Sequence, residues 1–313
     1  MKRVVRQAGT ALAVGLLVAA CSSNDKSSIS PHATATGNPA TTAAAQIGSS
    51  HGTLRVGGTS RSYRLYVPEA VGPLALVVAL HGGLGSGDQL ADTSQFEPLA
   101  EREHFVVVFP DGEGATWNAG TCCGTAVTRK IDDVAFLKSL VGEIARKVSI
   151  DRTRVFAVGH SNGAMMAFRL GCEASDMFSA VVPVAGSLEI DRCAPTKAVA
   201  LFAIHGDADR NHPIDGGSGD RSISNVSYRS MSTSLVMWTV AMGCTSSSDA
   251  VAGPIRTTTW TGCRQGVATK YTVIAGADHP WPGSVDKRAT ALQSVPTTAL
   301  DATAAAWDFL KGS

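Results

Sequence analysis

The sequence predicts an α/β fold with a mostly parallel central sheet and helices on both faces. Short continuous apolar runs alternate with segments of helical period, a pattern typical of strands that are buried on both sides. A glycine-flanked turn at 159–163 joins one of these strands to a helix. In open sheets of this kind, ligands bind outside the carboxyl ends of the strands, so we expect functional residues there.

The apolar runs also predict the order of the elements. Alternating runs at 53–56 and 62–67, with glycines between them, predict an antiparallel hairpin at one edge of the sheet. Buried strands are expected at 74–80, 105–109, 155–158, 178–184, 199–204 and 271–274. Helices are expected at 88–103, 132–148, 164–170, 235–242 and 299–310. Only about 14 residues separate the strands 178–184 and 199–204, which is too few for a large lid.

Length and charge limit the classes of protein to consider. The chain has 313 residues and a net charge of +1. Charges of both signs are mixed, with no basic stripe and no interleaving of aromatic and basic residues, so we expect no nucleic-acid partner. The length suits one α/β domain, which we place at 51–313.

The N-terminal segment predicts export and a lipid anchor. Residues 1–20 combine an early positive charge with a short apolar stretch, as in a signal peptide. Small residues precede Cys21 as in a bacterial lipobox, so we expect Cys21 to be lipidated and to bind the outer face of the cell membrane or envelope. Residues 21–50 are rich in small polar residues and predict a flexible tether. The alternative is a plain secretory signal that contains a cysteine.

The other six cysteines predict disulfides, because an even number is typical of exported proteins. Six cysteines allow 15 pairings, so the connectivity is a hypothesis. Cys244 and Cys263 flank one segment, Cys172 and Cys193 form a second expected pair, and the adjacent Cys122 and Cys123 remain. No metal site is expected, because the spacing lacks two C-x-x-C halves.

Ser161 is the candidate nucleophile. It is the central residue of Gly159-His160-Ser161-Asn162-Gly163, a G-x-S-x-G turn between a predicted strand and a helix. Such a turn strains the serine backbone and lifts its hydroxyl clear of the sheet. The helix N-terminus adds partial positive charge that favours an oxyanion. The alternative is an ordinary glycine-rich turn.

A serine nucleophile needs a base and an orienting acid. His279 follows the last predicted strand, in a loop with two prolines and a tryptophan, and is the candidate base. The candidate acid is Asp209 or Asp207, which both follow a strand end. We favour Asp209, because its longer stretch of loop can return towards His279, whereas Asp207 could cap a turn. The order serine, acid, histidine is that of an α/β-hydrolase.

An oxyanion hole needs two backbone N–H groups. Asn162, the residue after the nucleophile, should supply one of them. The other should come from the turn His81-Gly82-Gly83-Leu84 after strand 74–80. We favour Gly83, with Gly82 and Leu84 as alternatives.

Six stretches resemble the poly(3-hydroxybutyrate) depolymerase and feruloyl esterase family of α/β-hydrolases. They are 80–83, 117–124, 132–137, 159–163, 205–209 and 279–283, and the resemblance covers about residues 52–312. It implies Ser161, Asp209 and His279 as the catalytic triad. It also implies a substrate pocket that includes His81, Gly82, Trp117, His160 and Trp281. The segment Asn211-His212-Pro213 departs from the family pattern, which bears on substrate preference.

With the lipobox, the chain resembles an actinobacterial lipoprotein esterase of that family. The expected activity is hydrolysis of carboxylic esters of short acyl, feruloyl or hydroxyalkanoate type through an acyl-enzyme, without metal or organic cofactor. An open site suits a polymeric ester. The alternatives are a serine peptidase or thioesterase with the same triad, or a surface binding protein on an inactive hydrolase scaffold.

Overall fold

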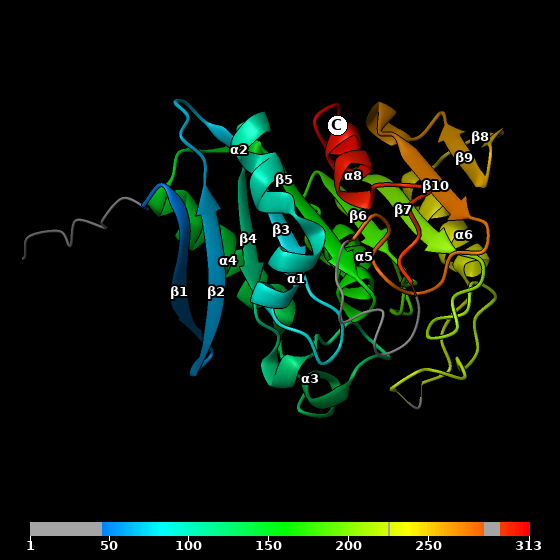
Figure 1. Ribbon diagram of the computed structural model, residues 1–313, viewed down its shortest axis with the longest axis horizontal. Helices are drawn as coiled ribbons and strands as arrows, with labels where there is room; N and C mark the ends of the chain where they lie inside the picture. The colour runs from blue at the N-terminus through cyan, green and yellow to red at the C-terminus, as the bar shows by residue number, and fades with distance from the viewer. Residues whose placement is uncertain (1–45, 225, 285–294) are drawn as a thin grey trace, which may run out of the picture. The chain divides into compact units, whose positions relative to one another are not determined.

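The centre of the described structure is a sheet of ten strands (Figure 1). The order across the sheet is β1-β2-β4-β3-β5-β6-β7-β10-β9-β8. The strands are β1 Gly48–Val56, β2 Thr59–Val67, β3 Leu74–Leu80, β4 Val106–Pro110, β5 Ile150–His160, β6 Ala180–Val184, β7 Ala200–Gly206, β8 Ser246–Ala252, β9 Ile255–Thr261 and β10 Thr269–Ile274. The central strands from β4 to β10 are parallel, and an antiparallel hairpin lies at each edge.

The computed structural model describes residues 46–224, 226–284 and 295–313. These residues belong to one compact unit, Thr42–Ser313. The predicted signal peptide, Cys21 and nearly all of the predicted tether lie outside the described residues. β1 begins at Gly48, slightly before the predicted start of the domain at residue 51.

Helices cover both faces of the sheet (Figure 1). On one face lie α1 Gly87–Ser94, α2 Phe96–Glu103 and α8 Ala302–Leu310. On the other face lie α4 Asp133–Lys147, α5 Asn162–Glu173 and α6 Met231–Met242. Short turns of helix complete the order: α3 Gly124–Thr128, η1 Glu113–Ala115 and η2 Arg264–Gly266.

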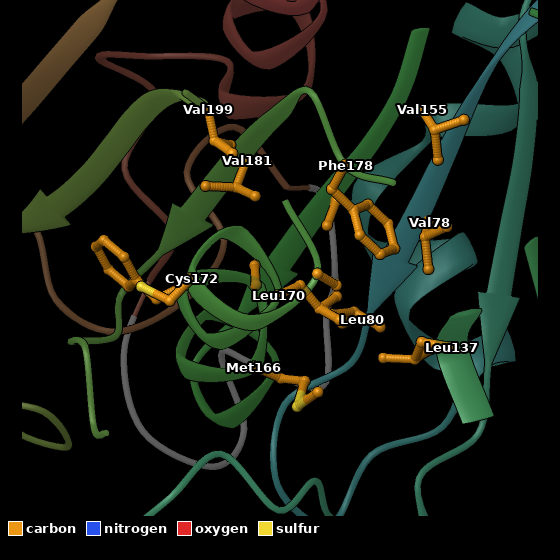
Figure 2. Close-up of a cluster of buried hydrophobic side chains, with 14 of the residues drawn as sticks. Val78, Leu80, Leu137, Val155, Met166, Leu170, Cys172, Phe178, Val181 and Val199 are labelled. Carbon is orange, nitrogen blue, oxygen red and sulfur yellow. The ribbon is translucent and has the colours of Figure 1, made fainter. Parts of the chain in front are cut away.

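The alternation of side chains along a strand gives the protein a core on each face of its sheet. Leu76, Val78 and Leu80 of β3 pack under α4 and α5, and Figure 2 shows part of this cluster. Val77 and Ala79 of the same strand pack under α1, α2 and α8. The continuous apolar run of β3 therefore reflects burial on both faces, as the sequence predicts.

The structure confirms the N-terminal hairpin and the six predicted buried strands. β1 and β5 each begin five residues earlier than predicted, and the other strand ends shift by three residues or fewer. The single helix expected at 88–103 is wrong, because the chain breaks into α1 and α2 at Gln95, which has a φ of 58°. The hairpin of β8 and β9 was not predicted. Every residue of β8 is exposed, so the strand has no apolar alternation to reveal it.

The structure contains the disulfides Cys122–Cys123, Cys172–Cys193 and Cys244–Cys263, which are the pairs expected from the sequence. Cys172–Cys193 joins α5 to the connection between β6 and β7. Cys244–Cys263 joins the segment after α6 to the residue that precedes η2. None of the described helices is long and apolar enough to span a bilayer.

Candidate active site

Ser161 lies between the central strand β5 and helix α5, in a strained turn. Its φ of 55° and ψ of −119° are unfavourable for a residue with a side chain. The flanking glycines make the turn possible. A Cβ on Gly159 would lie 2.1 Å from the carbonyl oxygen of Gly163, and one on Gly163 would lie 2.2 Å from that of Leu80. The local sequence therefore forces the serine into the conformation that a nucleophile elbow needs.

His279 and Asp209 reach Ser161 from neighbouring strand ends. β7 and β10 are adjacent and parallel, so the loops that follow them leave the same edge of the sheet. The His279 Nε2 atom lies 2.9 Å from Ser161 Oγ, and His279 Nδ1 lies 2.8 Å from Asp209 Oδ2. The arrangement can activate a hydroxyl, because a carboxylate orients an imidazole that is within hydrogen-bond distance of it.

Asp209 is a buried carboxylate, only 4% exposed, that the protein holds in its ionised form. Its Oδ1 accepts hydrogen bonds from the backbone N–H groups of Asn211 (2.9 Å) and His212 (2.8 Å). Burial alone would raise the pKa of Asp209. His279 and His205 outweigh burial and hold this pKa well below its usual range. The carboxylate is therefore available to stabilise an imidazolium at His279.

Asp207, the other candidate acid, takes no part in this contact. Its Oδ1 accepts a hydrogen bond of 2.7 Å from the backbone N–H of Gly276. Asp207 therefore ties the loop after β7 to the loop after β10, as a turn-capping carboxylate would. The structure places Asp209 rather than Asp207 against His279.

His160 holds the backbone of His279 in place. Its Nε2–H donates a 2.8 Å hydrogen bond to the carbonyl of His279, and the two ring centroids are 5.0 Å apart. Burial, together with the proximity of His279, lowers the pKa of His160 to about 4. His160 is therefore neutral near pH 7 and fixes the backbone of His279.

The turn after β3 brings backbone N–H groups close to Ser161. A Cβ on Gly82 would lie 3.3 Å from the Cβ of Ser161, and one on Gly83 would lie 3.9 Å from the Cβ of Asn162. The N–H of Leu84 already donates a 2.8 Å hydrogen bond to the carbonyl of Ala115. Leu84 is therefore unsuited as an oxyanion donor, and Gly82 and Gly83 remain as candidates for the donor opposite Asn162.

A pocket of about 440 Å³ opens above Ser161 and His279. Four of the predicted pocket residues line it: His81, Gly82, His160 and Trp281. The prediction for Trp117 is wrong. This side chain is fully buried beneath the turn after β3, where its indole N–H donates to the carbonyl of His81, and it does not line the pocket.

Several pocket residues were not predicted from the sequence. They come from α1, from the turn before it and from the connection between β7 and α6: Leu84, Gln89, Leu90, Thr93, Asn211, Ser222, Ile223 and Tyr228. His212 of the same connection also lines the pocket, near which the sequence had suggested that it could lie. Leu84 and Ile223 flank the mouth and are 71% and 64% exposed. The departure from the family pattern at 211–213 was the one signal in the sequence that pointed to this wall.

Within the described ranges, no group of three or more His, Cys, Asp or Glu side chains is placed to hold a metal ion. The polar groups around Ser161 instead pair with one another or with backbone groups.

The sequence model of the family described as "Esterase PHB depolymerase" matches residues 61–258. The chain belongs to this family. The match begins within β2 and ends within β9, so it includes Ser161 and Asp209, whereas His279 lies beyond it.

Curated relatives carry esterase names. NocK of Nocardia uniformis subsp. tsuyamanensis, whose name assigns it to the esterases, is 34% identical over 170 residues, 51% of this chain and 48% of NocK. Feruloyl esterase B of Piromyces equi is 26% identical over 214 residues, 65% of this chain and 39% of that protein. The chain thus spans about half or less of the length of these relatives.

Solved structures show the same fold. An acetyl xylan esterase from Aspergillus awamori superposes with a TM-score of 0.57 at 16% identity, covering 75% of this chain and 94% of that one. Native sOPH gives a TM-score of 0.51 at 15% identity, covering 85% and 91%. The family member described here therefore has the α/β-hydrolase fold, without a large lid between β6 and β7.

Proposed function

We propose that the protein is a serine esterase that hydrolyses carboxylic esters. The observation that carries this proposal is the chain of contacts from Ser161 Oγ to His279 and from His279 to the buried carboxylate of Asp209. The contacts lie at the floor of a pocket, beside two candidate oxyanion donors. Membership of an esterase family and the names of the relatives support the same activity.

The proposed mechanism uses only groups of this chain. Ser161 attacks the ester carbonyl while His279 Nε2 takes the hydroxyl proton. The N–H groups of Gly83 and Asn162 stabilise the negative charge on the carbonyl oxygen. His279 then gives the proton to the alcohol oxygen as its bond to the carbonyl carbon breaks. The alcohol departs, and the acyl group stays on Ser161. Water, activated by His279, hydrolyses this acyl-enzyme and restores the free serine.

We propose that the substrate is an ester whose acyl or alcohol part extends out of the pocket, such as a short-acyl, feruloyl or hydroxyalkanoate ester in a polymer. The connection between β6 and β7 is too short for a lid domain, which supports an open site. Relatives named feruloyl esterase and acetylxylan esterase/xylanase support this substrate range.

We propose export and anchoring through Cys21 from the sequence of residues 1–21. Mass spectrometry of the mature N-terminus tests this point. A lipidated Cys21 supports it, and an unmodified N-terminus at another residue contradicts it.

The activity test compares p-nitrophenyl acetate with the matching anilide and thioester. The proposal predicts that the ester is the best substrate and that Ser161→Ala removes its hydrolysis. Preference for the anilide would identify a peptidase, and preference for the thioester would identify a thioesterase. Absence of all three activities would support a binding protein on a hydrolase scaffold.

A further inference from the structure

The segment Gly112–Asn118, between β4 and α3, lies against the glycine turn that follows β3. The carbonyl of Ala115 accepts the N–H of Leu84 at 2.8 Å. The N–H of Gly112 donates to Nε2 of His81, also at 2.8 Å. Two hydrogen bonds from the segment Gly112–Asn118 thus hold the turn that contains Gly83 in place.

Trp117 of this segment bonds to both sides of the candidate oxyanion hole. Its indole N–H donates to the carbonyl of His81 at 2.9 Å. Its backbone N–H donates to Oδ1 of Asn162 at 2.7 Å, and its carbonyl accepts from Nδ2 of Asn162 at 3.0 Å. One residue therefore connects the turn of Gly83 to Asn162, although the two lie far apart in the sequence.

The direction of the Gly83 N–H follows from the same network. Since Nε2 of His81 accepts a hydrogen bond, the ring proton is on Nδ1, which donates to the carbonyl of Gly82 at 2.7 Å. The N–H of Gly85 donates to that carbonyl at 3.0 Å. The Gly82 carbonyl and the Gly83 N–H share one trans peptide plane and point in opposite directions. Fixing the carbonyl therefore fixes the N–H.

The segment is itself anchored in the interior. The backbone N–H of Asn118 donates to Oδ2 of Asp133 at 2.7 Å, and Asp133 is paired with Arg61. The Arg61 guanidinium lies 5.2 Å from the centre of the Trp117 ring. Arg61 is 7% exposed, and Asp133 and Trp117 are fully buried. Trp117 is therefore held by its contacts with His81, Asn162 and Arg61 and can act as a rigid spacer.

We propose that Trp117 is a positioning residue that sets the distance between the two oxyanion donors, the N–H groups of Gly83 and Asn162. This inference rests on the proposed function, because it concerns the same site. Charge on the carbonyl oxygen develops only in the transition state, so a misplaced donor should lower kcat and leave KM nearly unchanged. This positioning role also explains part of the motif at 117–124, which contains no residue of the triad.

The test is Trp117→Phe, which keeps an aromatic ring and removes the N–H that bonds to His81. Removal of a whole oxyanion donor costs about 10²- to 10³-fold. A misplaced donor should cost less, so we expect kcat for p-nitrophenyl acetate to fall about 10-fold, with KM within about twofold. The inhibition constant of an alkylboronic acid, which mimics the tetrahedral state, should rise by the same factor as kcat falls.

Trp238→Phe is the matched control. Trp238 is also fully buried, and its indole nitrogen has no hydrogen-bond partner among the described residues. This variant should keep the wild-type kcat and boronate affinity. Asn162→Leu, which keeps the backbone N–H and removes both side-chain bonds to Trp117, should resemble Trp117→Phe. In the double variant, kcat should fall by less than the product of the two single-variant factors, because both substitutions disturb the same spacing between the N–H groups of Gly83 and Asn162.

Equal kcat and boronate affinity in folded Trp117→Phe, Asn162→Leu and Trp238→Phe would overturn the inference. A rise in KM alone would also overturn it. The failure of the proposed function looks different, because the wild-type protein itself would then prefer the anilide or the thioester, or hydrolyse none of the three substrates.

Discussion

The half of the site that holds Ser161 is built differently from the half that holds His279 and Asp209. Ser161 lies in a turn between β5 and α5 whose shape depends on its own glycines and on the close approach of Gly163 to the carbonyl of Leu80. His279 and Asp209 lie in loops after β10 and β7, and they are held by each other and by side chains such as His160. The first half is determined mostly by the sequence of one turn, and the second is determined by tertiary contacts.

This difference decides what the sequence could predict. The G-x-S-x-G turn identified Ser161 at once, because the same residues that make the motif also make the strained turn. The choice between Asp209 and Asp207 depended on how far a loop returns, which no local pattern specifies. The connection between β7 and α6 also contributes pocket residues: Ser222, Ile223 and Tyr228. The sequence of that connection has no periodicity from which their position could be predicted.

The fold shows the same contrast. β3 has a fully buried apolar run and was predicted with its observed ends. β8 and β9 form an edge hairpin in which β8 is fully exposed, β9 is mostly half-buried, and Ser and Thr take the place of an apolar alternation. The Thr residues of β9 and the turn at Gly253-Pro254 are the signals that could have revealed this hairpin.

The largest expected effect is in the locally determined half. Ser161→Ala should lower kcat by about 10⁶-fold, because the nucleophile itself is lost. The fold should remain, since the Ser161 side chain contributes no core packing, and circular dichroism and thermal unfolding check this. Substantial turnover by the folded variant would mean that another group performs the attack.

In the half determined by tertiary contacts, Asp209→Asn should lower kcat by about 10⁴-fold, because the amide favours the wrong tautomer of His279. Asp207→Asn is the matched control, since it changes a neighbouring carboxylate of the same loop that bonds to Gly276. Steady-state measurement of kcat for both variants shows which carboxylate orients His279. If Asp207→Asn were the more damaging change, the loop register described here would be incorrect.

The half-buried His160, which lies between the two halves, predicts a dependence of stability on pH. The pKa of His160 is about 4 in the folded protein, against an ordinary value of 6.5. As the pH falls from about 6.5 to 4, the unfolded chain binds a proton that the folded protein does not, so folding becomes less favourable. This one group should remove about 3 kcal/mol of unfolding free energy over that range.

Urea unfolding at pH 7 and pH 4.5 measures this change, with His160→Gln as the comparison. The variant lacks the titrating group and should lose less stability between the two pH values than the wild-type protein. Equal losses in both proteins would show that other groups cause the acid sensitivity.

The smallest expected effect concerns the mouth of the pocket, where both halves meet. Leu84→Ser combined with Ile223→Ser should raise KM for a long apolar acyl ester by about threefold to tenfold, because each covered CH₂ contributes about 0.8 kcal/mol. KM for the acetate ester should not change. Val236→Ser with Val240→Ser, exposed residues of α6 outside the pocket, provides the control. Equal KM values in the two double variants would argue against a role for this rim.

The proposed esterase activity requires Ser161, His279 and Asp209 to act as one catalytic unit. The most direct measurement is peptide mapping by mass spectrometry after treatment of the wild-type protein, Ser161→Ala and His279→Ala with a fluorophosphonate. We expect one phosphonate adduct on Ser161 of the wild-type protein and none in either variant, because His279 activates the hydroxyl. An adduct on another serine, or rapid labelling of Ser161 in His279→Ala, would contradict this expectation.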